Sequence, residues 1–341
     1  MKRLICSHVD LDGLGSVLIY LYFKEKRTIP GMDFDTYILL DYGWEQNPGN
    51  IDYMALFDEV IMADISAPKE YIEQIRDRGT RVRIFDHHLA SEWLRDDPDS
   101  VWDKERSGTR IFWEEYARPL VRRYPTVIQE LVNRVDVYDC WREDSPLWEE
   151  AKALNSVLYG LKNYSAGNEI DSNKDFIETM LRKFNLFPNE WVWIGKEKRL
   201  IQESLKREEE LFKTAKEEMK IRIDTKDRLF GIFTLGSKIS LICSRILREN
   251  EGLDYVICIN SFHGINGKLS FRSKRPDLDL NTFAGVHGHA AAAGAQVTPE
   301  MADTIWKQDY VPVYLDEQKE ELKPGEMTPF QFYDQEVHLP F

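Results

Sequence analysis

Short apolar runs alternate with amphipathic stretches along the first 90 residues of the chain. The runs are rich in apolar and β-branched residues, and this pattern predicts β-strands. We expect these strands at 2–7, 35–40, 59–63 and 81–85. Residues 14–26 are apolar and then charged, which predicts a helix packed on a sheet, and residues 69–79 have helical spacing that ends at Gly79. Strands that alternate with helices predict an α/β fold with a doubly wound, mainly parallel sheet.

The rest of the chain divides into a helical part and a second set of strands. Residues 105–141 have helical spacing, and its apolar positions include Val127, Ile128, Leu131, Val132 and Val135. From 190 to 220 acidic and basic residues alternate, which predicts an exposed helical connector. Strand patterns return at 228–235, 254–260 and 268–273, and predict a smaller α/β lobe. We therefore divide the chain into 1–188, a connector at 189–224, the second lobe at 225–315 and an irregular tail at 316–341.

Composition excludes several classes of protein. The 341 residues are 43% hydrophobic, enough for two folded domains. With 45 Lys and Arg against 59 acids, the net charge is −14, which argues against binding long duplex DNA. The four cysteines form no CxxC pair, so we expect neither a disulfide framework nor a cysteine zinc site. The early acids and the lack of a long apolar run indicate neither a signal peptide nor a membrane span, and we expect a cytoplasmic location.

Histidines and acids follow three of the predicted strands directly. Because the carboxyl ends of parallel strands open on one crevice, we expect these side chains to share one site. In an extended segment, alternate residues point the same way, so the His-x-Asp-x-Asp spacing after the first strand predicts a common direction. The residues are His8, Asp10 and Asp12 after the first strand, Asp64 after the third, and Asp86, His87 and His88 after the fourth.

These residues together indicate a divalent cation. Taken alone, Asp64 or Asp86 fits a helix N-cap or a loop acid better than a metal ligand. Buried together without a cation, however, the carboxylates would repel each other and their pKa values would rise. Imidazole and carboxylate ligands without cysteine favour Mn²⁺ first and Mg²⁺ second. A pair of ions about 3.5–4 Å apart is typical of displacement at phosphorus, so the pattern points to phosphoester hydrolysis.

Three segments resemble the first three motifs of the DHH phosphoesterases. They are SHVDLDG, VIMADIS and IFDHH, which contain the clusters described above. This superfamily includes RecJ exonucleases, nanoRNases and family II inorganic pyrophosphatases, and the pairing of SHxDLDG with YDxW is most similar to nanoRNases. The family's fourth motif is an aspartate after a helix, for which Asp139 in VYDCW fits better than its rival Asp136. SGTRIFWE, from Ser107, resembles the helical segment that the family places between the third and fourth motifs.

The second lobe resembles the DHHA1 domain that accompanies many DHH domains. KLSFRS and FAGVHGHAAAAGA are similar to its signature, in which His289 and Gly294 match while Val286 and His287 replace two glycines. The resemblance implies a DHH catalytic domain at 1–188 and a DHHA1 substrate-binding domain at 225–315. Without the resemblance, Arg272 would be a surface charge on a strand and the run of small residues would indicate tight helix packing.

The resemblance also implies a role for each site residue. Two ions would share Asp64 as a bridging ligand, and a water between them would attack phosphorus. The remaining ligands would be His8 and Asp10 for one ion, and Asp12, His87 and Asp139 for the other. Asp86 would orient His87, and His88 would contact the scissile phosphate. The substrate residues of the second lobe would be Arg272, Ser273, Gly288 and His289.

The sequence therefore predicts a phosphodiesterase, dependent on Mn²⁺ or Mg²⁺, that degrades short single-stranded oligoribonucleotides (nanoRNA) to mononucleotides. The same chemistry on linear or cyclic dinucleotides, 3′-phosphoadenosine phosphate or single-stranded DNA is the close alternative. A catalytically silent scaffold and a hydrolase unrelated to phosphorus are the other classes. Trp44 and Trp141 either stack on a base or belong to the core. The oligomeric state stays open.

Overall fold

The computed structural model describes residues 2–26, 34–41, 43–164, 169–260, 267–308, 310–317 and 330–332. The chain divides into two compact units, Met1–Ser204 and Leu205–Phe341, which we call unit 1 and unit 2. The division falls within helix α9 (Gly195–Glu218), part of the segment that the charge pattern assigns to a connector. Each unit has its own sheet and its own hydrophobic core. The α/β class expected from the sequence is therefore confirmed.

Unit 1 is built on a five-stranded sheet in the order β2-β1-β3-β4-β5, and all neighbouring strands are parallel. The strands are β1 (Arg3–His8), β2 (Phe34–Leu40), β3 (Glu59–Ala63), β4 (Arg81–Asp86) and β5 (Val101–Trp102). The predicted parallel sheet is confirmed. Strand β5 was not predicted, because two residues are too short for a period to show in the sequence.

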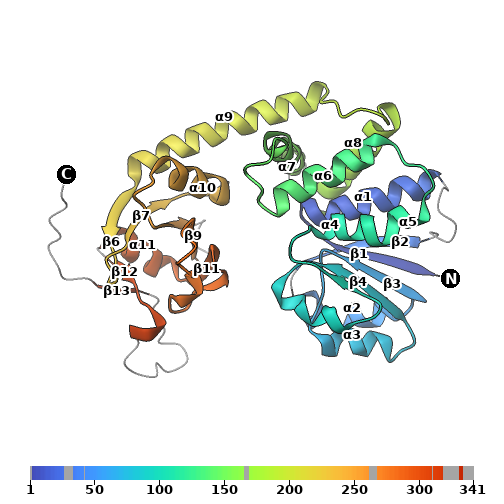
Figure 1. Ribbon diagram of the computed structural model, residues 1–341, viewed down its shortest axis with the longest axis horizontal. Helices are drawn as coiled ribbons and strands as arrows, with labels where there is room; N and C mark the ends of the chain where they lie inside the picture. Colours follow the sequence, from blue (N-terminus) through green and yellow to red (C-terminus); the bar gives the residue numbers. More distant parts are fainter. Residues whose placement is uncertain are drawn as a thin grey trace. The chain divides into compact units, whose positions relative to one another are not determined.

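Helices cover both faces of this sheet (Figure 1). On one face α2 and α3 pack on the strands, and on the other face lie α1 and α4 to α6. Helices α7 and α8 pack in turn on α6 and α1. The elements are α1 (Leu11–Lys26), η1 (Trp44–Gln46), α2 (Pro48–Met54), α3 (Lys69–Arg76), η2 (Leu89–Asp96), α4 (Gly108–Ile111), the π-helical η3 (Phe112–Ala117), α5 (Arg118–Leu120), α6 (Thr126–Asp139), α7 (Trp148–Tyr164) and α8 (Glu169–Leu186).

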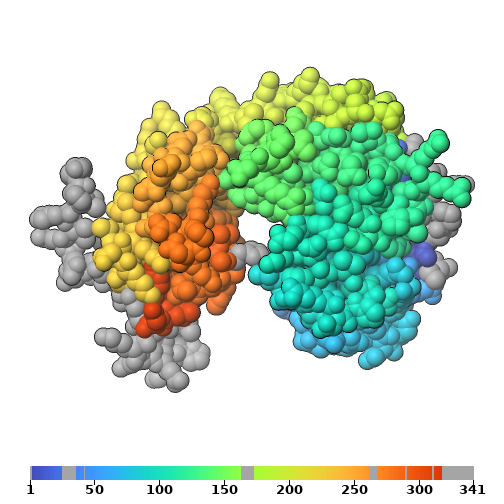
Figure 2. All heavy atoms as spheres, viewed as in Figure 1, coloured from blue at the N-terminus to red at the C-terminus, as the bar shows by residue number. Residues whose placement is uncertain are grey.

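Strand side chains alternate between the two layers of helices. Ile5 and Ile61 pack in the cluster that contains α1, whereas Cys6 and Met62 pack in the cluster that contains α2 and α3. Because both faces are covered, β1 and β3 are almost continuously buried rather than alternately buried and exposed. The apolar positions predicted for α6 are all fully buried in the first of these clusters. In Figure 2 the segments coloured cyan and green, which include α4 to α7, cover much of the visible face of unit 1.

Unit 2 contains a mixed six-stranded sheet in the order β10-β11-β9-β8-β7-β6. Only β7 and β8 pair in parallel; the other neighbours are antiparallel. A separate pair, β12 with β13, includes residues of the predicted irregular tail. The elements are β6 (Lys220–Ile223), β7 (Leu229–Thr234), α10 (Ile239–Glu249), β8 (Tyr255–Asn260), β9 (Gly267–Ser273), η4 (Leu280–Thr282), β10 (His287–His289), β11 (Ala292–Val297), α11 (Pro299–Lys307), β12 (Tyr310–Pro312), η5 (Leu315–Glu317) and β13 (Phe330–Phe332).

One expectation and one alternative interpretation for this half of the chain were wrong. The charged helix ends at Glu218 and a strand begins at Lys220, so the helix is shorter than 190–220 at both ends. The run of small residues forms β10 and β11 rather than a tightly packed helix. Most of the predicted tail, 318–329 and 333–341, lies outside the described residues. No helix among the described residues is both long and apolar enough to cross a membrane.

Candidate metal centre

The carboxyl ends of β1, β3 and β4 bring the predicted clusters together. In the sheet register Ser7 pairs with Ala63, and Ala63 pairs with Phe85. The next residue of each strand is therefore a site residue, and these are His8, Asp64 and Asp86. The parallel sheet thus places side chains that are far apart in the sequence at one edge, as the strand pattern predicted.

A first group of ligand atoms joins His8, Asp10 and Asp64, whose atoms lie within 4.8 Å of one another. The Nδ1 atom of His8 is 2.9 Å from an Asp10 oxygen and 3.9 Å from Asp64 Oδ2. The other Asp10 oxygen accepts a hydrogen bond from the N–H of Gly13, so Asp10 also caps the first turn of α1. One carboxylate thus fixes the helix start and faces the site.

A second group joins Asp12, His87 and Asp139. The Nε2 atom of His87 lies 3.3 Å from Asp139 Oδ2, 3.8 Å from Asp12 Oδ2 and 3.3 Å from Asp64 Oδ1. Asp64 therefore approaches both groups, through Oδ2 on one side and Oδ1 on the other. This is the geometry that a bridging carboxylate requires.

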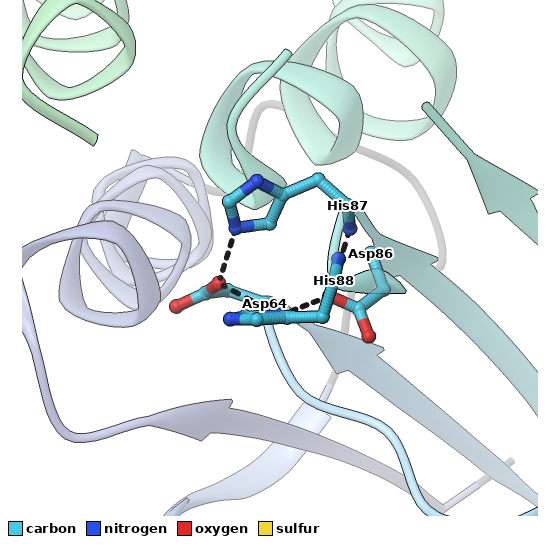
Figure 3. A group of neighbouring side chains, drawn as sticks. All are labelled: Asp64, Asp86, His87 and His88. Carbon is cyan, nitrogen blue, oxygen red and sulfur yellow. Dashed lines mark hydrogen bonds and ion pairs between the residues drawn. The ribbon is translucent and has the colours of Figure 1, made fainter. Parts of the chain in front are cut away.

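Asp86 holds both histidines of the third cluster (Figure 3). One of its oxygens lies 2.8 Å from His88 Nδ1 and accepts a hydrogen bond of 2.8 Å from the N–H of His87. The other accepts the hydroxyl of Ser91 at 2.5 Å. Asp86 thus acts on His87 through the backbone, while its side-chain partner is His88.

Asp12 reaches the site by a route that differs from the one expected. Strand β1 ends at His8 and α1 begins at Leu11, so the spacing of His8, Asp10 and Asp12 does not lie in an extended segment, and the alternation argument was wrong. Asp12 lies instead on the first turn of α1. Its two oxygens accept the N–H groups of Gly108 at 2.6 Å and Thr109 at 2.8 Å, and the Thr109 hydroxyl donates to the Asp12 carbonyl.

The start of α4 is therefore part of the site, which the residue pattern did not reveal. A Cβ atom on Gly108 would lie 2.6 Å from Asp64 Cβ. Only glycine therefore fits between Asp64 and Asp12, whose oxygen accepts the Gly108 N–H. The sequence marked this segment only through its family resemblance. Asp41, which follows β2 and lies 3.6 Å from His8 Nε2, was also missed.

The structure separates Asp136 from Asp139. Asp139 contributes to the second group, whereas Asp136 is fully buried and forms ion pairs with Arg110 at 3.0 Å and Arg142 at 2.8 Å. Asp136 also accepts the N–H of Ser107 at 3.0 Å. Its charge is thus compensated by protein groups, and it braces the loop that leads into α4.

Burial and mutual repulsion perturb the acids of the site. Burial raises the pKa of Asp12, and burial together with the charges of neighbouring acids raises the pKa of Asp64 and of Asp139 well above the ordinary value. Burial would also raise the pKa of Asp10, but the hydrogen bond and charge of His8 outweigh it and lower that pKa to about 2. For Asp86, the interaction with His88 overcomes burial in the same way and lowers the pKa.

The histidines respond to the same two influences. Burial lowers the pKa of His87 despite the nearby acids, so the neutral imidazole that a metal ion requires is favoured. For His8 and His88, burial also acts to lower the pKa, but the hydrogen bonds to Asp10 and Asp86 prevail and raise it.

The residues present fit a divalent cation. Among the described residues, the buried atoms of the site that lack a hydrogen bond of ordinary geometry include Asp64 Oδ2, His87 Nε2 and Asp139 Oδ2. Buried polar atoms are almost always hydrogen-bonded, so several exceptions at one point indicate a missing positive charge. Oxygen and imidazole donors suit Mn²⁺ and Mg²⁺. The cluster could therefore bind metal, although the ligand assignment of each residue stays a prediction.

The substrate residues predicted for unit 2 lie on β9 and β10. Arg272 is half-buried, and its guanidinium donates to Ser240 Oγ at 2.9 Å and to the Phe271 carbonyl at 2.7 Å. Burial lowers its pKa, and no acid forms an ion pair with it among the described residues. The hydroxyl of Ser273 is engaged with backbone, donating to the Asp254 carbonyl. Of the remaining two, His289 is placed only as part of the backbone of β10.

Gly288 is required by the close approach of two strands. Its φ is 150°, and a Cβ atom there would lie 2.7 Å from the Ala292 carbonyl oxygen in β11. The close approach at Gly288 and the contacts of Arg272 and Ser273 do not test whether these residues bind substrate. Their substrate-binding role stays a prediction.

Comparisons with known proteins agree with this geometry. Residues 2–118 match the model of the DHH family, N-terminal domain, and no curated protein matches the sequence. Among solved structures, exonuclease RecJ bound to manganese is 14% identical, with 90% of this chain and 88% of that chain covered and a TM-score of 0.56. RecJ in complex with Mn²⁺ from Thermus thermophilus is also 14% identical, with 90% of this chain and 51% of that chain covered and a TM-score of 0.52. This chain spans about half the length of the latter.

These likenesses concern the fold. The two solved structures have a fold similar to that of this chain, and both were determined with manganese. A specific closeness to nanoRNases stays a prediction.

Proposed function

We propose that this protein, whose residues 2–118 match the DHH N-terminal domain, is a divalent-metal-dependent phosphoesterase that hydrolyses short oligoribonucleotides to mononucleotides. The observation that carries the proposal is that two groups of His and Asp ligand atoms lie on either side of Asp64, one near each of its carboxylate oxygens. A structural role does not account for buried carboxylates that repel one another.

We assign one ion to His8 and Asp10 and the other to Asp12, His87 and Asp139, with Asp64 between them. Bound ions would supply a nucleophile at neutral pH and stabilise the charge that develops at phosphorus. The protein's part is to fix the ligands. The N–H groups at the start of α4 hold both oxygens of Asp12, and Asp86 fixes the backbone that carries His87.

Other side chains are suited to the substrate. His88 is oriented by Asp86 and lies beside the ligand groups, so it can contact the scissile phosphate. Arg272 presents a guanidinium without an ion-pair partner among the described residues, and such a fork of donors matches a terminal phosphate. The net charge of −14 favours a short substrate, since a long polyanion would need a basic track.

The test is hydrolysis of a substrate panel in the presence of Mn²⁺. The panel contains a diribonucleotide, a five-mer and a longer RNA, a DNA five-mer, a cyclic dinucleotide, 3′-phosphoadenosine phosphate and pyrophosphate. We expect preferred cleavage of the dimer and the RNA five-mer, with the activity lost in Asp86→Ala and kept in Asp96→Ala, an exposed aspartate. Preferred cleavage of another member would overturn the substrate assignment. Bound Mn²⁺ without hydrolysis of any member would overturn the proposal that the protein is an enzyme and would favour a catalytically silent scaffold.

A further inference from the structure

Trp141 adopts a backbone conformation that glycine normally occupies. Helix α6 ends at Asp139, and Trp141 follows with a φ of 52°. The N–H of Trp141 donates to the Tyr138 carbonyl and the N–H of Arg142 donates to the Val137 carbonyl, the two bonds of a Schellman turn. In the left-handed position of this turn a non-glycine residue costs about 1–2 kcal/mol. Glycine would therefore suit this position of the turn better, and the presence of an indole needs an explanation of its own.

The turn lies directly beside the second ligand group. Asp139 Oδ2 is 3.3 Å from His87 Nε2, and Trp141 is two residues further along the chain. Two peptide units span at most about 7 Å, which limits the distance between the Cα atoms of Asp139 and Trp141. A nucleotide bound beside the second ligand group could therefore contact the indole. Backbone strain is frequently found at functional sites, and Asp64 of the same centre also has a positive φ, of 59°.

The indole is supported by other rings but is not enclosed by them. It meets Trp148 at a centroid distance of 5.1 Å and an angle of 70°, and Tyr138 at 6.0 Å and 57°. Trp148 is buried and Trp141 is half-buried. No ring of the described residues stacks parallel on the Trp141 indole. In contrast, Trp44 is only 5% exposed and donates its Nε1–H to a backbone carbonyl, as a core residue does.

We infer that Trp141 is a stacking platform for the base of the nucleotide that binds beside the Asp12, His87 and Asp139 group. The inference rests on the proposed function and adds to it that the substrate must carry a base at this position. Every base has a flat face, so the platform binds nucleotides without selecting a sequence. The neighbouring rings hold the indole in place before the substrate arrives, which reduces the entropy lost on binding.

A purely structural role for Trp141 makes a different prediction. If the indole only covered Trp148, its loss would weaken the turn and lower activity on every substrate alike. Trp141→Gly separates the two roles, because glycine relieves the left-handed strain while it removes the ring. Trp141→Phe keeps an aromatic face, and Trp306→Phe, a half-buried tryptophan in unit 2, is the matched control.

The experiment compares kcat/KM for the diribonucleotide pApA with that for two analogues in which one of the riboses lacks its base. The wild-type protein should prefer pApA over one of the analogues by about tenfold or more, the range expected for one stacked base. Trp141→Gly should lose this preference through KM, Trp141→Phe should keep most of it, and Trp306→Phe should keep all of it. Mn²⁺ affinity, measured by calorimetry, should be unchanged in each variant because Asp139 is retained.

The outcomes separate this inference from the function on which it rests. If the wild-type protein hydrolyses neither pApA nor its analogues, the proposed function fails. If it hydrolyses pApA and Trp141→Gly lowers the rates for pApA and both analogues by the same factor, or leaves the preference intact, the stacking role is overturned while the phosphoesterase stands.

Discussion

Asp139→Asn should stabilise the metal-free protein and at the same time remove its response to Mn²⁺. Asp139 and Asp12 offer oxygen atoms within 4.8 Å of each other, and two full charges at that separation repel by about 3.5 kcal/mol at an effective dielectric constant of ~20. Burial first, and then the charges of Asp12 and Asp10, raises the pKa of Asp139. Partial protonation relieves some of the repulsion, so we expect a gain of about 1–3 kcal/mol in the free energy of unfolding near pH 8.

The gain should depend on pH in a defined direction. A raised carboxyl pKa means that the folded protein binds the proton more tightly than the unfolded chain does. The metal-free wild-type protein therefore loses stability as pH rises from the ordinary carboxyl pKa of 3.8 through the raised value of Asp139. Asparagine does not titrate, so the advantage of the variant should be small near pH 4 and should grow toward pH 8.

Thermal unfolding with a chelator and with Mn²⁺ provides the assay. For a unit of this size 1 kcal/mol corresponds to about 2–4 °C in Tm, so the metal-free variant should melt several degrees above the wild type. Asp136→Asn is the matched control. It breaks the buried ion pair with Arg110, which should cost about 3 kcal/mol, and lowers Tm with and without metal.

Two results would refute this reasoning. A lower Tm of metal-free Asp139→Asn would show that the acids do not repel one another in the fold. A Mn²⁺-induced rise in Tm that persists in Asp139→Asn but disappears in Asp136→Asn would identify Asp136 as the ligand.

Three further substitutions test other parts of the structure. Thr109→Val removes the hydroxyl that donates to the Asp12 carbonyl and should weaken Mn²⁺ binding about tenfold in calorimetry; unchanged affinity would mean that this contact does not position the ligand. Gly288→Ala should lower the free energy of unfolding of unit 2 in urea by about 1–3 kcal/mol, because the new Cβ meets the Ala292 carbonyl; wild-type stability would show that β10 can move away. Burial lowers the pKa of Lys183 to about 8, so the unfolded chain holds that proton more tightly and wild-type stability should rise from about pH 8 to 10.5. Lys183→Met should lack that part of the rise in urea melts, and an identical pH slope would contradict the assignment.

Elements with long, uniform patterns were the predictable part of the fold. Strands β1 and β3 are covered on both faces, so burial acts on nearly every residue and leaves an apolar run in the sequence. Helix α6 buries one stripe, which appears as a helical period. Strand β5 and the hairpin of β10 and β11 gave no comparable signal. The first is too short, and the second is built from alanine and glycine, which are compatible with close packing of strands or of helices.

The sequence indicated the residue types of the site but not the groups that hold those residues in position. Asp12 lies close to the other predicted residues, yet its position comes from the first helical turn and not from an alternating strand. The groups that hold it are backbone N–H donors of Gly108 and Thr109, which are 96 and 97 residues away. A backbone donor is the same atom in nearly every residue, so the sequence carries little trace of it.

The sequence by itself determined the α/β class and the placement of histidines and acids at the ends of buried strands, because burial and parallel pairing constrain every residue of those runs. Only the tertiary structure showed which groups surround the two aspartates of one helix. Asp136 forms ion pairs with Arg110 and Arg142 that neutralise it, whereas Asp139 lies 3.3 Å from His87 and faces other acids. The physical reason is that the charge balance of a buried carboxylate depends on groups that reach it through space, and those groups come from distant parts of the chain.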